Sequence, residues 1–231
     1  MMIRAAFKQL ARAAGRHEAV ALVLDHGDRW ALWPCANAAA DPAQHYQIAA
    51  AEWLTASKAG RIAAVLHSHP DSSPPSQADH DAASALRVPH HVYAVASDAW
   101  HCLPAGRRYT GREFMWGTAD CWALVRDWYA SERAVWLPGT EGCSGEGWER
   151  SEPDAFVRRL ARYGFAPIAL TDAAPGDVLL FALQSSQANH SAILLHDNQI
   201  LHHLQHRLSA VDDFDGYWRK VMTHALRYTA S

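Results

Sequence analysis

The feature that most constrains the fold is a break in the middle of the chain. Residues 104–112 read PAGRRYTGR, a polar stretch that contains glycine and has neither helical nor strand periodicity, while patterned segments lie on both sides of it. Such a stretch is typical of a domain boundary. At roughly 150 residues per domain, a chain of 231 residues corresponds to about 1.5 domains. We therefore predict two domains, residues 1–103 and residues 107–231.

The first half alternates helical and strand patterns. The initial segment, MMIRAAFKQLARAAGRHEAV, has the spacing of an amphipathic helix, and an Asp-His-Gly-Asp turn at 25–28 then joins two apolar strands. The next predicted elements are a helix at 47–58, a strand at 61–67, a helix at 77–87 and a strand at 91–97. This order predicts a mixed α/β domain.

The second half places its helices first and its strands afterwards. Helical patterns cover 120–132 and 153–163, separated by a loop rich in Gly, Ser and Glu. Strand patterns follow in APGDVLLFAL, NHSAILLH, QILHHL and the tail around 217–228. Helices followed by a run of strands predict an α+β domain with an antiparallel sheet.

Charge and cysteine usage exclude several classes of protein. The 21 basic and 24 acidic residues leave a net charge of -3, which argues against a general nucleic-acid binder. The sequence has no run of about 18 apolar residues, which a membrane span would need, and no apolar core of a signal peptide. We therefore expect the chain to fold in a cytoplasm. The cysteines, Cys35, Cys102, Cys121 and Cys143, form no CxxC pair, which argues against a Cys-based zinc finger or a disulfide framework.

The first candidate site lies at the end of the strand 61–67. His67 and His69 are two residues apart, so in extended chain they share a face. With Asp79 they supply three N/O ligands for tetrahedral Zn²⁺, although His80 or Asp81 could replace Asp79. Ser76 is a plausible N-cap that places Asp79 in the first turn of the next helix. Glu18, in the predicted first strand, could serve as the general base for a zinc-bound water.

These residues carry a family resemblance. The motif HSHP, followed by S-x-x-D and preceded by an upstream Glu, resembles the JAMM/MPN metalloprotease signature over about residues 1–103. Members of that family are zinc-dependent isopeptidases and peptidases. The resemblance implies His67, His69 and Asp79 as metal ligands, Glu18 as general base and Ser76 as the stabiliser of a tetrahedral oxyanion.

The second candidate site combines a thiol with histidines. Cys121 stands at the predicted start of a helix, where we expect the helix dipole to lower the pKa of the thiol. His190 opens a later strand and could act as its base. A third group must orient that imidazole, and both His202 and His203 follow across the next turn. A two-residue turn puts His203 on the face of His190 and a three-residue turn puts His202 there, so strand parity leaves the choice open.

A second resemblance covers about residues 107–231. GREFMWGTADCWALVRDWY, then APGDVLLF, then NHSAILLHDNQILHH resemble the NlpC/P60 family of papain-like cysteine peptidases, which cut peptidoglycan stem peptides. The resemblance implies Cys121 as nucleophile, His190 as base, His202 as orienter and Tyr109 near the oxyanion.

The two domains in one chain resemble the tail assembly proteins of lambda-like phages. That resemblance implies peptidoglycan and other phage tail-tip proteins as partners, synthesis in the host cytoplasm and a place at the virion tail tip. The alternative is a tail-assembly scaffold in which one or both sites are silent. A wall-remodelling enzyme of the host itself would need an export signal, which the sequence does not show.

Overall fold

The computed structural model describes residues 2–27, 29–103, 109–139, 145, 147–150 and 154–230. The chain forms two compact units. The first unit comprises Met1–Arg107 and Trp128–Trp136, and the second unit comprises Arg108–Asp127 and Leu137–Ser231. The predicted division into 1–103 and 107–231 stays a prediction, and residues 104–108 at its boundary lie outside the described residues.

The segment Trp128–Trp136 belongs to the first unit for a clear physical reason. Its side chains Ala130, Ala134 and Trp136 are buried in the same apolar cluster as the residues of the N-terminal helix. The helix that carries Ala130 begins in the second unit, so one helix contributes residues to both units.

The first unit is a mixed α/β fold, as the sequence predicts. Its sheet has the order β2-β1-β3-β4-β5, with β3 and β4 parallel and every other pair antiparallel. The strands are β1 Val20–Asp25, β2 Trp30–Cys35, β3 Arg61–His69, β4 His90–Ala94 and β5 Ala99–Leu103. The helices are α1 Met2–Ala14, α2 Ala50–Ala59 and α3 Gln77–Leu86. Strand β5 is the one element of this unit that the sequence prediction lacked.

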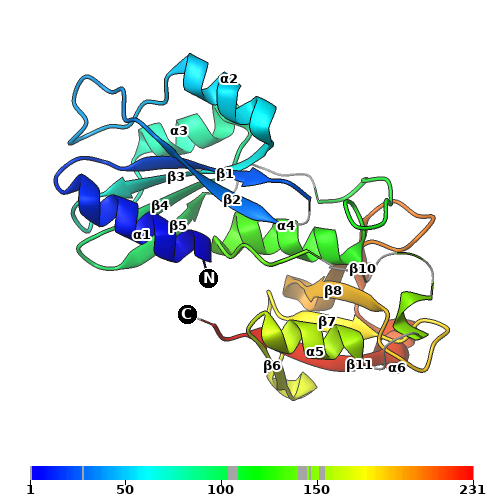
Figure 1. The fold of residues 1–231 in the computed structure, drawn as a ribbon. Coiled ribbons are helices and arrows are strands. Elements are labelled where there is room, and N and C mark those ends of the chain that lie inside the picture. Colours follow the sequence, from blue (N-terminus) through cyan, green and yellow to red (C-terminus); the bar gives the residue numbers. More distant parts are fainter. Residues whose placement is uncertain are drawn as a thin grey trace. The chain divides into compact units, whose positions relative to one another are not determined.

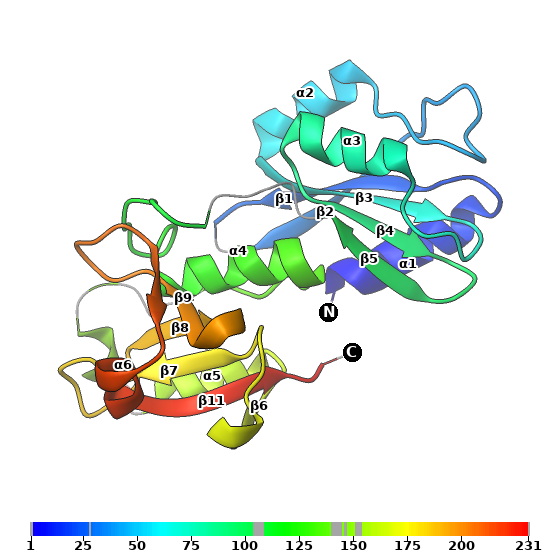
Figure 2. The same cartoon turned by 180° about the vertical axis from the view of Figure 1, so that it is seen from behind.

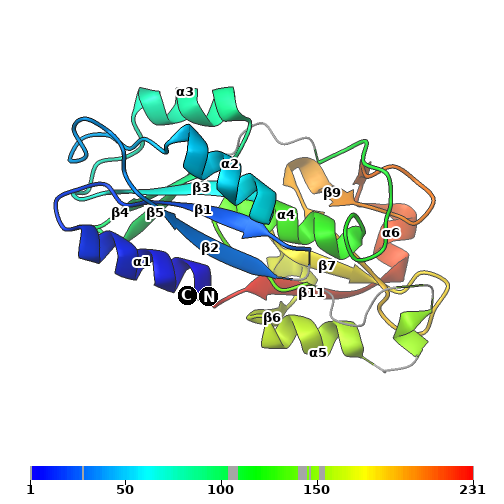
Figure 3. The ribbon, with the colours of Figure 1, turned by 45° about the horizontal axis from the view of Figure 1, so that its top comes forward.

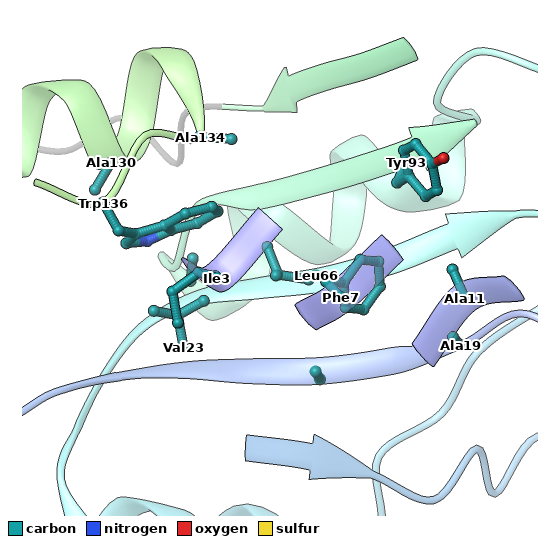
Figure 4. Packing of buried hydrophobic residues seen from close by; sticks show 12 residues of the cluster. Ile3, Phe7, Ala11, Ala19, Val23, Leu66, Tyr93, Ala130, Ala134 and Trp136 are labelled. Carbon is teal, nitrogen blue, oxygen red and sulfur yellow. The ribbon is translucent and has the colours of Figure 1, made fainter. Parts of the chain in front are cut away.

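Helices cover both faces of this sheet, with α1 on one face and α2 and α3 on the other (Figures 1 and 3). Ile3, Phe7 and Ala11 of α1 recur every four residues, share one helix face and are buried. They pack against a cluster that includes Leu66 and Tyr93 of the central strands (Figure 4). Because both faces are covered, the central strands β1 and β3 carry continuous runs of buried residues instead of alternating buried and exposed ones.

The second unit is an α+β fold built on an antiparallel sheet of order β10-β9-β8-β7-β11-β6. Its strands are β6 Phe165–Ile168, β7 Val178–Phe181, β8 His190–Leu194, β9 Gln199–His202, β10 Ala210–Asp213 and β11 Met222–Tyr228. Its helices are the first part of α4 Cys121–Arg133, α5 Ala155–Arg162 and α6 Gly216–Val221, and short 3-10 turns occur at Trp148–Arg150, Leu170–Asp172 and His196–Asn198. Figure 2 shows β9, β8, β7 and β11 side by side.

The predicted antiparallel strands are confirmed, with three additions. Strands β6 and β10 were not predicted, and α6 occupies the first residues of the predicted strand around 217–228. Trp218 of α6 is buried on the sheet with Phe181 and Phe214, which explains why this short segment is helical despite its weak sequence signal. In the same unit, the ring of Trp122 of α4 contacts the rings of Phe156 of α5 and Phe165 of β6.

In the part of the chain that the structure describes, no helix combines the length and the apolar character needed to cross a membrane. Cys35, Cys102 and Cys121 are free thiols.

Candidate active sites

The end of β3 and the start of α3 bring the first set of predicted residues together. His67 and His69 lie on the same face of β3, as strand alternation requires. Ser76 is the N-cap of α3, and its hydroxyl accepts the Asp79 N–H at 3.3 Å. In return the Asp79 carboxylate accepts the Ser76 N–H at 2.6 Å, which completes a capping box. This local motif holds Asp79 in the first helical turn and directs its carboxylate to the two histidines.

Four buried side chains converge at this point, Glu18, His67, His69 and Asp79. Asp79 Oδ1 lies 3.0 Å from His67 Nε2, and Asp79 Oδ2 lies 3.5 Å from His69 Nε2. Glu18 Oε1 lies 3.8 Å from His69 Nε2. One ligand atom each of Glu18, His67 and His69 falls within 4.8 Å of the others. His80 and Asp81 are exposed on α3, so Asp79 is the residue of this helix that joins the cluster.

Neighbouring groups orient the two imidazoles. His69 Nδ1 lies 3.1 Å from the carbonyl oxygen of Ser73, and an N–H at this atom donates to that oxygen and leaves Nε2 facing the carboxylates. The ring of Tyr46 stacks on His67, with centroids 4.4 Å apart. A cleft of about 500 Å³ opens onto the cluster and is lined by residues that include Glu18, His69 and Asp79.

Burial and charge shift the proton affinities in this cluster. Burial raises the pKa of Glu18 to about 7, partly opposed by His69, and burial lowers the pKa of His67. Although burial opposes it, hydrogen bonding to His67 and His69 holds the pKa of Asp79 well below its usual range. The hydrogen bond to Asp79 raises the pKa of His69. The cluster therefore combines one firmly ionised carboxylate with one that titrates near neutral pH.

The second site begins at the N-terminus of α4. Asp120 precedes Cys121 and accepts the Ala123 N–H at 2.8 Å and the Gly117 N–H at 2.7 Å, so it both caps the helix and fixes the preceding turn. Cys121 itself is 8% exposed. Burial, followed by the charge of Asp120, raises the pKa of the Cys121 thiol to about 12. The expectation of a lowered thiol pKa is therefore wrong, because desolvation and the neighbouring Asp120 carboxylate raise it.

His190 opens β8 and meets His202 of β9. The register pairs Ala192 with His202, which puts His190 and His202 on the same face of the sheet. His190 Nε2 lies 3.3 Å from His202 Nδ1, and the rings meet edge to face. The connecting turn is the three-residue His196–Asn198 segment, which corresponds to the predicted arrangement that selects His202. His203 lies instead against the ring of Phe114.

Comparisons with known proteins cover the regions that carry both clusters. Residues 111–227 match the model of the NlpC/P60 family, and residues 2–106 match the model of prokaryotic homologs of the JAB domain. The chain is 31% identical over 202 residues to tail tip assembly protein K of Escherichia phage N15, covering 85% of this chain and 82% of that protein. It is 32% identical over 177 residues to tail tip assembly protein K of Escherichia phage lambda, covering 76% and 85%.

The chain belongs to the tail tip assembly protein K family. Within this family member, the JAB match contains the cluster around His67, and the NlpC/P60 match contains Cys121, His190 and His202. A solved structure of an NLP/P60 family protein from Staphylococcus aureus is 20% identical and overlaps 53% of this chain and 38% of that chain with a TM-score of 0.39, a likeness too limited to support an argument.

In this K-family chain, sequence reasoning missed one residue of the second site. Asp212 of β10 lies with its Oδ2 3.1 Å from His202 Nε2, so His190, His202 and Asp212 form a continuous line of contacts. No local motif marks Asp212, and β10 itself was not predicted. Pairing of Ala210 with His202 in the sheet is what brings Asp212 within reach.

A cleft of about 520 Å³ joins the parts of the second site, and both Cys121 and His190 line it, together with Asp212. Burial lowers the pKa of His202 and lowers that of His190 well below the ordinary 6.5, so both imidazoles are neutral at pH 7. Tyr109 is not among the described residues that line this cleft, and its ring lies 5.5 Å from the Arg112 guanidinium. Its role near an oxyanion stays a prediction.

Proposed function

We propose that the second unit is a cysteine peptidase that cleaves amide bonds in peptidoglycan stem peptides. The observation that carries this proposal is His190, which contacts His202 and lines the cleft that Cys121 also lines, in a region that matches the NlpC/P60 family. The set supplies a nucleophile, a base and an orienting group, the three parts that acyl transfer through a thiol requires.

In the proposed resting state the thiol and the imidazole are both neutral, because burial raises the pKa of Cys121 and lowers that of His190. In the proposed reaction the Cys121 sulfur attacks the scissile carbonyl carbon while its proton passes to His190. The C–N bond then breaks, the departing amine takes the proton from His190, and a thioacyl enzyme remains. Water, deprotonated by His190, cleaves the thioester and restores the thiol. His202 holds the His190 ring in the orientation that both proton transfers need.

We further propose that the first unit is a zinc-dependent peptidase or isopeptidase. The donor set of two imidazoles and a carboxylate fits Zn²⁺, and His67, His69 and Asp79 would hold it. Zinc bound there supplies an acidified water and a Lewis acid. Glu18, close to His69 Nε2, is placed to accept a proton as general base, and the Ser76 hydroxyl, which donates to Asp79 Oδ2 at 2.8 Å, is the proposed oxyanion stabiliser.

The relatives extend the proposal to a setting. Both are named tail tip assembly proteins of phages. We infer that this chain is made in the host cytoplasm, is associated with the virion tail tip, and has peptidoglycan and other tail tip proteins as partners. No nucleic-acid partner is proposed.

A digest of purified sacculi tests the thiol site. We expect wild-type protein to release peptide fragments and Cys121→Ala to release none. Cys102→Ala, which removes a free and partly buried thiol from β5 of the first unit, is the matched control and should retain full release. Release by Cys121→Ala at the wild-type rate would rule out the thiol mechanism.

Elemental analysis tests the metal site separately. Purified protein should carry about one zinc per chain, and the double variant His67→Ala with His69→Ala should carry none. His80→Ala, at an exposed position of α3, should keep the metal. Wild-type protein that stays metal-free after incubation with zinc would refute the site.

One observation favours a second candidate function, a tail-assembly scaffold with a silent thiol. Cys121 is only 8% exposed, and burial opposes its ionisation. Complementation with Cys121→Ala distinguishes the two functions, because a scaffold still assembles infectious tails without the thiol, whereas a required peptidase does not.

A further inference from the structure

We propose that Asp212 is a positioning residue that selects the tautomers of His202 and His190 and thereby presents a lone pair on His190 Nδ1. The inference rests on the proposed function of the Cys121 site. Asp212 lies on the edge strand β10, and the pairing of β10 with β9 is what brings it to His202.

The Asp212 carboxylate fixes the position of the ring proton on His202. An ionised carboxylate only accepts hydrogen bonds, so the 3.1 Å contact between Asp212 Oδ2 and His202 Nε2 requires the proton of that imidazole to be on Nε2. A neutral imidazole carries one ring proton, which leaves a lone pair on His202 Nδ1. That atom lies 3.3 Å from His190 Nε2, and it therefore accepts the proton of His190 Nε2.

The same step repeats at His190. With its single proton on Nε2, the neutral ring has its lone pair on Nδ1, which is the only nitrogen left to serve as a base. Burial keeps both rings neutral at pH 7, so each ring has a definite tautomer to select. Asp212 thus determines the state of a ring that it does not touch.

The other neighbours hold the ring planes without choosing a tautomer. Trp218 stacks on His190 with centroids 5.9 Å apart and meets His202 edge to face at 4.6 Å. The ring of Phe181 also lies near His190, with centroids 5.9 Å apart. Of the described residues, Asp212 is the carboxylate in contact with either imidazole, so it supplies the directional signal that aromatic packing lacks.

Charge alone does not account for this role. The Asp212 side chain is 36% exposed, so solvent screens its charge, and the cation of Arg207 acts on His202 in the opposite sense. The contribution of Asp212 is therefore directional hydrogen bonding. Losing an orienting partner of this kind typically costs about 10–100-fold in rate. We expect that loss in kcat, because Asp212 orients the base.

Tautomers can be read directly by long-range ¹H–¹⁵N correlation spectra of the ¹⁵N-histidine-labelled full chain at pH 7. Wild-type protein should show His202 and His190 both protonated at Nε2. In Asp212→Asn the new amide can donate to His202 Nε2, so His202 should move to the Nδ1–H form, His190 should lose its fixed tautomer, and kcat should fall about 10–100-fold. Asp212→Glu, which keeps a carboxylate, should restore the wild-type pattern.

Asp213→Asn is the matched control. Asp213 is the next residue of β10, and its Oδ1 accepts a hydrogen bond from Gln199 at 3.3 Å on an exposed part of the sheet. This variant should change neither tautomer nor rate. An unchanged His202 tautomer in folded Asp212→Asn overturns the proposal whatever the activity. The spectra need no substrate, so the two proposals can fail separately. If Asp212→Asn shifts the tautomer but wild-type protein releases no peptide, the proposed function is refuted and the role of Asp212 stands.

Discussion

Removing the Asp120 side chain should destabilise the start of α4 by about 2.5–4 kcal/mol. Asp120 is 2% exposed, so solvent does not replace the hydrogen bonds that Asp120→Ala removes. The lost N-cap bond to Ala123 contributes about 1 kcal/mol. The bond from Gly117 to a charged acceptor contributes about 1.5–3 kcal/mol. Asp120→Ala removes both hydrogen bonds, so the two free energies add to the expected loss.

Protection of the Cys121 thiol measures this loss at the right place. The buried thiol is labelled in urea only when the surrounding structure opens, and mass spectrometry of the Cys121 peptide separates it from the other cysteines. Rates are normalised to those of the fully unfolded chain, since Asp120→Ala also lowers the pKa of the thiol. Asp213→Ala, which loses one long exposed bond, should change the opening free energy by less than about 0.5 kcal/mol. An equally small change in Asp120→Ala would show that the Asp120 hydrogen bonds do not stabilise the start of α4.

Three further predictions follow from packing, backbone geometry and titration. Phe7→Ala should cost about 3–5 kcal/mol in urea unfolding, since the ring is fully buried, and a cost below 1 kcal/mol would contradict the assigned core. Gly164→Ala should lower the free energy of unfolding by at least about 1 kcal/mol more than Gly111→Ala. Both glycines have positive φ, but only a Cβ at Gly164 would clash, at 2.5 Å from Ala230 Cβ. Equal shifts of the thermal unfolding midpoint in the two variants would contradict this. In the proposed peptidase, kcat/KM should stay level as pH falls towards 6.5 and decline only below it, because burial lowers the pKa of His190 and its neutral form is the base; a decline already complete at pH 7 would contradict this.

Local patterns predicted much of the fold and the placement of Asp79 in the first turn of its helix. The helical spacing of Ile3 and Phe7 and the apolar run of β3 are properties of neighbouring residues, so the sequence displays them. The placement of Asp79 is also local, since the cap at Ser76 and the turn that follows are set within four residues. For this reason the sequence alone placed Asp79 in the first turn of its helix. His80 and Asp81 remained alternative ligands until the structure showed them exposed.

The second site depends on features that the sequence does not display. The choice between His202 and His203 is decided by the length of one turn, which sets the register of β9. Asp212 enters through pairing between β9 and β10, and no spacing rule reaches across that pair. The raised pKa of Cys121 comes from tertiary burial, whereas the sequence suggested only the helix N-terminus. Each failure lies where long-range packing decides the chemistry.

The most direct test of the central claim is a parallel digest of purified sacculi by wild-type protein, Cys121→Ala and the double variant His67→Ala with His69→Ala. We expect wild type and the histidine double variant to release stem-peptide fragments and Cys121→Ala to release none, because the proposed cleaving thiol belongs to the second unit. Fragment release by Cys121→Ala at the wild-type rate, or none by folded wild-type protein, would rule out the proposed peptidase.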